Sequence, residues 1–184
     1  LARPGMALDV GALGKGYACD QLIQLYRDRG VTAAIVSVGG SIAALGRPEG
    51  RTYTIGIRDP RGDASSYIAT LPLEDSFCST SGDYERYFEI DGVRYHHIFD
   101  PATGYPAQSG LLSVTVLSHS GIASDALSTA CFVLGPEEGA ALLKKWGAEG
   151  IFILADGAVR VTPGLKGTFS LVEGTPYRLE VATP

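Results

Sequence analysis

The sequence lacks the features of a membrane-spanning or nucleic-acid-binding chain. None of its apolar runs reaches the about 18 residues that a transmembrane helix needs, and its longest basic run is Lys144–Lys145. The lack of a longer basic run and the net charge of −5 argue against a nucleic-acid partner. The three cysteines, Cys19, Cys78 and Cys131, are too far apart for a metal knuckle, and their odd number argues against a full disulfide framework. We therefore interpret them as buried free thiols.

The composition is that of a folded chain. Of the 184 residues, 45% are apolar and 19% are charged, which is enough apolar material for a core and excludes disorder. The chain begins at Leu1 without a signal peptide, and its one methionine is Met6. We therefore expect a fragment or a processed chain, whose compartment the missing signal does not reveal.

Hydrophobic periodicity predicts three helices among many short strands. The helices are expected at 14–29, 122–134 and 136–146, where Gly30 stops the first and Pro136 starts the third. Strands are expected at 33–38, 41–46, 53–58, 67–71, 76–79, 87–90, 93–99, 111–119, 150–155, 158–161 and 177–181. Because hairpins are interspersed with helices, we expect an α+β fold rather than a doubly wound sheet.

A glycine-rich loop precedes the first predicted helix, in the segment LDVGALGKGYACD. The free amides of a helix N-terminus and the helix dipole favour a phosphate there. Lys15 lies at this helix start, where the dipole disfavours a cation unless an anion is close by. Asp9 precedes the loop and could bind a ribose or a base edge. The loop is too short for a Walker A motif, and an ordinary strand-to-helix turn explains it equally well.

Two histidines precede a polar turn in HHIFDPATGYP. Adjacent residues of a strand point to opposite faces, so at most one of His96 and His97 can face a given pocket. His97 could act as a general acid or base near neutral pH. The alternative for either histidine alone is structural, with one in the core and one on the surface.

Two oxygen-bearing side chains lie one helical turn apart in SDALST. Asp125 and Thr129 are at positions i and i+4, so both project from the same face of the second predicted helix, 122–134. A carboxylate and a hydroxyl are the hard ligands that Mg²⁺ prefers, and substrate phosphates and water can complete its coordination. Taken alone, the pair is explained as well by a helix cap and a packed threonine.

The order of these motifs carries more information than any one of them. The pattern DxxAxxKGYAxD, a VGGxI strand, SGDYERYF, HHIxDPxTGYP and SDALSTAxFVLG together resembles the FAD:protein FMN transferases of the ApbE family. The resemblance implies a T-fold-like α+β architecture with mixed and antiparallel sheets. It also implies that 1–184 is the C-terminal major part of a flavin transferase domain, without the N-terminal region of the family.

The resemblance implies an activity and a location. Such enzymes use Mg²⁺ to move FMN from FAD onto a threonine hydroxyl of a target flavoprotein, and they release AMP. They usually work outside the bacterial cytoplasm, often as lipoproteins, so any lipid anchor of this protein is expected outside this chain. An FAD pyrophosphatase that uses water as acceptor, or an inactive flavin-binding domain, remains an alternative on the sequence.

The resemblance also assigns roles to single residues. It implies metal ligation by the Ala12 carbonyl oxygen and by Asp125 and Thr129, and transfer assisted by His97. FAD-binding positions would be Asp9 and Lys15, with Ile98 against the flavin.

This chain departs from the family pattern in two ways. Ser37 and Ser41 stand around the GG element, where the family usually has Asn and Asp, so hydrogen bonds from longer side chains are lost or shortened. The expected N-terminal region, which supplies part of the flavin contacts, is not in this sequence, and we therefore expect the chain to bind FAD incompletely by itself.

Overall fold

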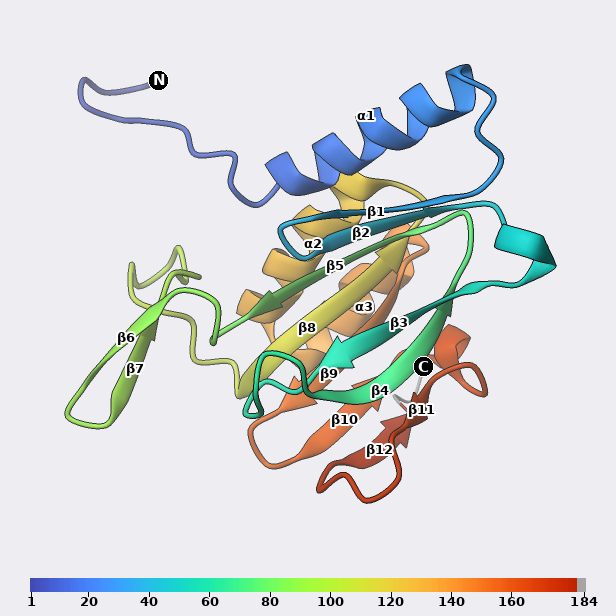
Figure 1. The fold of residues 1–184 in the computed structure, drawn as a ribbon. Helices are drawn as coiled ribbons and strands as arrows, with labels where there is room; N and C mark the ends of the chain where they lie inside the picture. Colours follow the sequence, from blue (N-terminus) through green and yellow to red (C-terminus); the bar gives the residue numbers. More distant parts are fainter. Residues whose placement is uncertain (182–184) are drawn as a thin grey trace.

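A seven-stranded sheet forms the centre of the protein (Figure 1). In this computed structural model residues 1–181 are described, so 182–184, the last three residues of the expected domain, lie outside the described residues. The strand order is β1-β2-β5-β8-β9-β10-β12, and a three-stranded sheet, β11-β4-β3, and a two-stranded hairpin, β6-β7, accompany it. All neighbours in the large sheet are antiparallel except β10 and β12, which run parallel. The predicted α+β class is therefore confirmed.

The elements have the following bounds. The helices are α1 (Gly14–Asp28), α2 (Gly121–Leu134) and α3 (Pro136–Trp146), with two 3₁₀ turns, Pro48–Gly50 and Pro163–Leu165. The strands are β1 (Ala34–Val38), β2 (Ser41–Leu45), β3 (Tyr53–Arg58), β4 (Tyr67–Leu73), β5 (Phe77–Gly82), β6 (Tyr87–Ile90), β7 (Val93–His96), β8 (Leu111–Ser118), β9 (Glu149–Leu154), β10 (Ala158–Val161), β11 (Ser170–Leu171) and β12 (Arg178–Val181).

The large sheet is covered on both faces. The helices pack on one face, with α1 over β1 and β2, α2 over β5 and β8, and α3 over β9, while β3 and β4 cross the other face (Figure 1). Strand β9 explains this arrangement, because its central residues are apolar on both sides. Ile151 and Ile153 belong to the core beneath the small sheet, and Phe152 belongs to the core beneath α2 and α3. Successive side chains of a strand point to opposite faces, so one strand contributes to both cores.

Most differences from the expected elements lie at their ends. The strand expected at 93–99 ends at His96, because the chain then turns inward and forms only a single bridge between Phe99 and Pro106. Strand β5 is longer than expected and reaches Gly82. The short strand β11 was not expected, and its two residues are recognisable only through pairing with β4. All three cysteines are buried and free, as expected.

Helices α1 and α2 touch through two glycines. A Cβ atom built on Gly16 would lie 2.0 Å from the carbonyl oxygen of Gly121, and one built on Gly121 would lie 2.2 Å from that of Gly16. No side chain fits at such distances, so the first turns of the two helices meet backbone to backbone. Gly16 and Gly121 are 105 positions apart in the chain, and together they determine how closely α1 and α2 pack.

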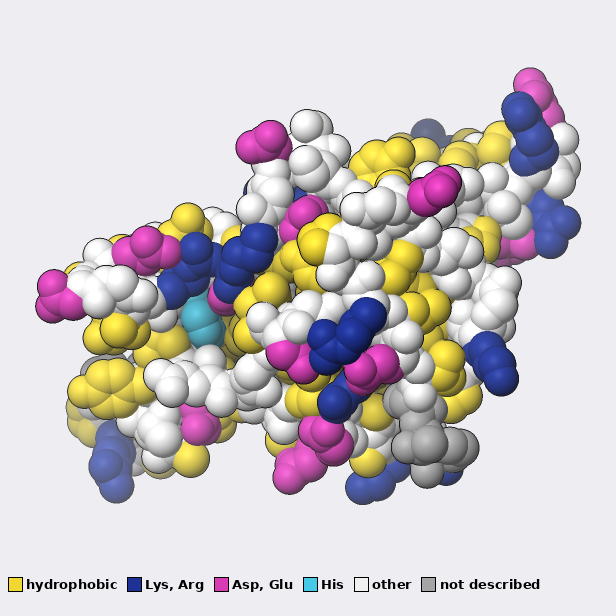
Figure 2. Space-filling model, turned by 90° about the horizontal axis from the view of Figure 1, so that it is seen from below, with side chains coloured by type: hydrophobic (Ala, Val, Ile, Leu, Met, Phe, Trp, Pro, Cys, Tyr) yellow, Lys and Arg dark blue, Asp and Glu magenta, His cyan; other side chains and the backbone are white. Residues whose placement is uncertain are grey.

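The surface carries both charges in close proximity. On the face that Figure 2 shows, lysine and arginine side chains lie beside aspartate and glutamate side chains. The ion pairs of the protein include Arg61 with Asp83 at 2.6 Å and Arg160 with Glu180 at 3.0 Å. Within residues 1–181, the helices are too short or too polar to cross a membrane.

The glycine contact predicts a sharp difference between two substitutions in the same helix. Gly16→Ala should lower the free energy of unfolding by about 3 kcal/mol, because the added methyl group meets backbone atoms that cannot yield without separating the helices. Gly14→Ala is the matched control, since a Cβ at that position has no neighbour within 4 Å. The control should stay within about 1 kcal/mol of the wild type. Urea unfolding followed by circular dichroism measures both, and equal midpoints would contradict the close packing.

Candidate functional site

A buried carboxylate lies where α1 and α2 meet. Asp125 is on α2, one turn after its start, and is 1% exposed. Its Oδ1 atom lies 2.9 Å from the Nζ atom of Lys15, and its Oδ2 atom accepts a hydrogen bond of 2.9 Å from the backbone amide of Gly16. Burying an unpaired carboxylate is costly, and these two partners offset that cost for Asp125.

The surroundings of Asp125 fit a cation. The ammonium of Lys15 is a cation already held at its Oδ1 atom. Thr129 lies one turn further along α2, and its Oγ1 atom is 3.1 Å from the Oγ atom of Ser81 and 3.5 Å from the Asp125 carbonyl oxygen. A carboxylate and a hydroxyl on one side of a helix are hard oxygen donors, as Mg²⁺ requires. Among the described residues, however, His, Cys, Asp and Glu nowhere form a group of three suited to a metal. The ion would therefore need oxygen ligands from the backbone, water or a substrate.

A second carboxylate, Asp20, completes the contact between the helices. Its Oδ1 atom accepts a hydrogen bond of 2.7 Å from the Gly121 amide, and its Oδ2 atom accepts one of 2.9 Å from the Ile122 amide. These amides belong to the first turn of α2 and have no partner within their own helix. Asp20 of α1 therefore caps α2, just as Asp125 of α2 receives the Gly16 amide of α1.

Small polar residues fill the interface between α2 and the sheet. Ser79 of β5 donates to Ser41 of β2 at 3.0 Å and lies 3.0 Å from the Oγ atom of Ser124 of α2. Further along, Ser81 is 2.9 Å from the Oγ atom of Ser128. Short side chains let α2 lie close to β5, and their hydroxyl groups satisfy one another. Ser41 therefore has a hydrogen-bond partner in Ser79, while Ser37 is exposed on β1.

The N-terminal loop places Asp9 and Ala12 beside the start of α1. Asp9 is exposed, and its Oδ1 atom accepts a hydrogen bond of 2.6 Å from the Gly11 amide, which closes a local turn. Ala12 is half-buried within the next turn, three residues before Lys15. The N-cap residue of α1, Leu13, has no side chain that can accept a hydrogen bond from the helix. The first turn of α1 therefore lacks a side-chain cap from its own loop.

The two histidines have opposite environments, as strand alternation predicts. His96 is buried, its Nε2 atom lies 3.1 Å from the Ala107 carbonyl oxygen, and its ring meets the edge of Phe132. Burial disfavours the charged form of the His96 ring and therefore lowers the pKa of His96. His97 is exposed, and its Nδ1 atom lies 3.3 Å from the Arg86 carbonyl oxygen. In residues 1–181 it has no hydrogen bond or ion pair to Asp125 or Lys15.

Ile98 lies in the core. It is 5% exposed and belongs to the cluster beneath α2 and α3. Little of its side chain is therefore open to a ligand, and its assigned contact with a flavin stays a prediction. The following turn forms as expected, with the Gly104 amide donating to the Asp100 carbonyl oxygen at 2.8 Å.

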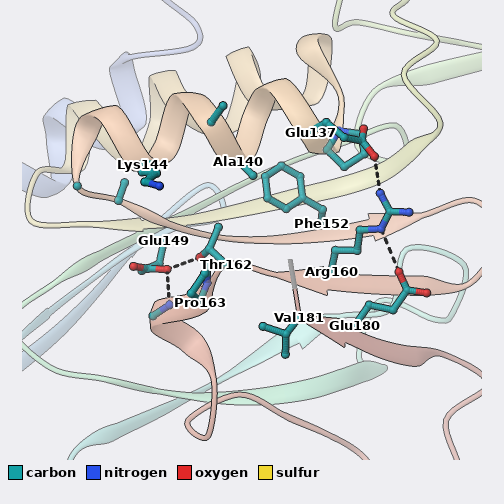
Figure 3. A pocket seen from close by; sticks show the side chains of 15 residues that line it. Glu137, Ala140, Lys144, Glu149, Phe152, Arg160, Thr162, Pro163, Glu180 and Val181 are labelled. Atoms are coloured by element: carbon teal, nitrogen blue, oxygen red, sulfur yellow. Dashed lines mark hydrogen bonds and ion pairs between the residues drawn. The ribbon is translucent and has the colours of Figure 1, made fainter. Parts of the chain in front are cut away.

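A large open cavity lies elsewhere, between α3 and the strands β9, β10 and β12 (Figure 3). Its volume is about 990 Å³, and none of the predicted site residues lines it. Arg160 is held between Glu137 at 2.7 Å and Glu180 at 3.0 Å, and Glu149 is bound by Thr162 and by the Gly164 amide. Arg160 and the three glutamates of this cavity thus have partners within the chain, so the chemistry of the chain points to Asp125 rather than to this cavity.

Comparison with known proteins identifies the family of the chain. The model of the ApbE family matches residues 1–152. The chain belongs to the ApbE family. It is 42% identical over 175 residues to an FAD:protein FMN transferase of Treponema pallidum, a match that covers 90% of this chain and 48% of that protein. The structure is similar to that of the ApbE protein of Thermotoga maritima, with a TM-score of 0.82 and 39% identity over 90% of this chain and 54% of that one.

A third similarity is to the flavinyl transferase ApbE of Pseudomonas stutzeri. The TM-score is 0.73 and the identity 36%, over 88% of this chain and 51% of that one. The expected architecture is therefore confirmed as that of ApbE proteins. The chain spans about half the length of the ApbE relatives that it matches.

Sequence reasoning found Lys15 and Asp125 but did not pair them, and it gave no role to Asp20, Gly16 or Gly121. The sequence does contain a signal for Asp20, which lies five residues beyond Lys15 in the motif KGYACD. The role of Asp20 as a cap of α2 could not be predicted from the sequence, because the amides that it binds are about a hundred residues away in the chain.

The capping role of Asp20 leads to a local prediction. Asp20→Ala should lower the free energy of unfolding by about 2 kcal/mol, because the Gly121 and Ile122 amides lose their acceptor. Hydrogen exchange of the Gly121 and Ile122 amides should quicken in this variant. Asp28→Ala is the matched control, since Asp28 lies at the exposed far end of α1. Unchanged protection of the two amides in Asp20→Ala would rule out the cap.

Proposed function

We propose that the protein transfers FMN from FAD to a threonine hydroxyl of a target flavoprotein, requires Mg²⁺ and releases AMP. The observation that carries this is the pairing of buried Asp125 with Lys15 at the start of α1, in a chain of the ApbE family. The relatives named FAD:protein FMN transferase support the transfer of FMN from FAD to a protein.

The proposed reaction assigns a task to each group. The hydroxyl oxygen of the acceptor forms a bond to the phosphorus of the FMN half, and the bridging P–O bond breaks so that AMP leaves with the electron pair. Bound Mg²⁺ would neutralise negative charge that develops on the pyrophosphate. His97 is our candidate for the base that receives the hydroxyl proton, since it is exposed and can be reached from solvent.

The remaining residues would bind and orient. Lys15 suits the phosphates, because its ammonium lies at the start of α1, where the helix dipole also favours an anion. Asp125, Thr129 and the Ala12 carbonyl oxygen would hold the metal. Asp9 lies on the same loop and would contact the FAD, and the flavin would lie near Ile98.

We further propose that the protein works outside the bacterial cytoplasm, with any lipid anchor outside this chain. The resemblance to the ApbE family supports this. To test this, a reporter enzyme that is active only after export would be fused to the protein. Reporter activity would support export, and an inactive reporter would show that the protein stays in the cytoplasm.

The reaction predicts covalent flavin on an acceptor. The protein, produced as this chain and as the full-length gene product, would be incubated with FAD, Mg²⁺ and an acceptor that carries the target threonine. Asp125→Ala should lower the rate about 100-fold, because contacts that stabilise developing charge are worth several kcal/mol. Fluorescence in a denaturing gel and the mass gain of FMN measure the product.

Control reactions distinguish FMN transfer from the alternative activities. Asp28→Ala should leave the rate unchanged, since it lies at the exposed far end of α1. An acceptor with the threonine replaced by alanine should stay unlabelled. Free FMN formed without an acceptor would favour a pyrophosphatase, and no covalent flavin from either form of the protein would contradict the proposal.

A further inference from the structure

The two carboxylate oxygens of Asp125 have partners of very different mobility. Oδ2 is bound by the Gly16 amide, which is part of the backbone of α1 and cannot leave without unwinding the helix. Oδ1 is bound by the ammonium of Lys15, at the end of a four-carbon stem. A competitor for Asp125 can therefore replace only the partner of Oδ1.

The stem of Lys15 has room to move. Its side chain is 35% exposed, compared with 2% for Asp125. The stem passes over the turn between β1 and β2, where a Cβ atom on Gly39 would lie 3.2 Å from the Cδ atom of Lys15. The ammonium also lies 3.4 Å from the Gly11 carbonyl oxygen, which offers it a second acceptor toward the surface.

The ammonium of Lys15 and a divalent metal ion would compete for the carboxylate of Asp125. An isolated buried carboxylate is costly, so Asp125 needs a positive partner before any metal arrives. Two cations a few ångströms apart repel each other strongly in a site that is shielded from water. The ammonium and a divalent cation therefore cannot both occupy the position at Oδ1.

We propose that Lys15 is a tethered counter-ion that occupies the cation position at Asp125 and is displaced when a divalent cation binds there. This rests on the metal site of the proposed function and adds a role for Lys15 before FAD is present. The exchange keeps Asp125 paired in both states, so the contact between α1 and α2 persists while the ammonium is released toward the loop that ends at Gly14.

The exchange can be observed on Lys15 itself. The chain would be acetylated briefly with a limiting reagent, with and without Mg²⁺ and in the absence of FAD, and each lysine would be quantified by mass spectrometry. Mg²⁺ should raise acetylation of Lys15 roughly fivefold, since a salt bridge of this exposure is worth about 1 kcal/mol. The exposed lysines Lys144, Lys145 and Lys166 are internal controls and should not respond.

Two variants provide the matched comparison. In Asp125→Asn, Lys15 should react rapidly already without Mg²⁺ and should not respond to it. In Lys15→Met, Mg²⁺ should bind roughly fivefold more tightly by calorimetry, because the competing cation is gone. Lys166→Met should leave the affinity as it is in the wild type.

The outcomes that overturn the exchange differ from those that overturn the proposed function. Binding of Mg²⁺ that leaves Lys15 acetylation unchanged, or an affinity that is unchanged or weaker in Lys15→Met, overturns the exchange alone. Failure of both the wild type and Lys15→Met to bind Mg²⁺ also overturns it. Flavin transfer is measured separately with FAD and acceptor, so a protein that transfers FMN without this exchange keeps the proposed function.

Discussion

The candidate site depends on the reciprocal capping of α1 and α2. Asp125 of α2 accepts the Gly16 amide of α1, and Asp20 of α1 accepts the Gly121 and Ile122 amides of α2. All three bonds require the first turns of the helices to meet, which is possible only because Gly16 and Gly121 face each other without side chains. Separating the helices would therefore leave two carboxylates and three amides without their partners at once.

This arrangement creates the electrostatics of the site. A helix start carries partial positive charge, and α1 directs one of its free amides at a carboxylate that is almost completely buried. The negative charge is thereby held deep in the protein, while the mobile cation that balances it lies near the surface on Lys15. A carboxylate that is fixed by backbone on one oxygen and balanced by a flexible ammonium on the other is suited to exchanging cations. In the large cavity near Arg160, by contrast, Arg160 is held between two carboxylates, those of Glu137 and Glu180.

Local sequence patterns were reliable where neighbours in the chain decide the structure. Helix α3 begins at Pro136 and ends at Trp146, as expected from its proline start and its periodicity. The alternation of His96 and His97 between core and surface followed from strand geometry alone. The same reasoning failed for the end of β7, because Ile98 is drawn into the core beneath α2, which lies far along the chain. It also failed for β11, whose two residues are a strand only through their partner β4.

The sequence by itself determined the α+β class, most of the elements and the family, since the ordered motifs lie in short segments whose residue types are legible without a fold. It also identified Asp125, Thr129 and Lys15 as separate candidates. Only the tertiary structure decided that Lys15 and Asp125 are partners and that Asp20 holds the start of α2. Those contacts join residues about a hundred positions apart, and a backbone amide is an available partner at every residue, so no local pattern reveals which one a carboxylate will find.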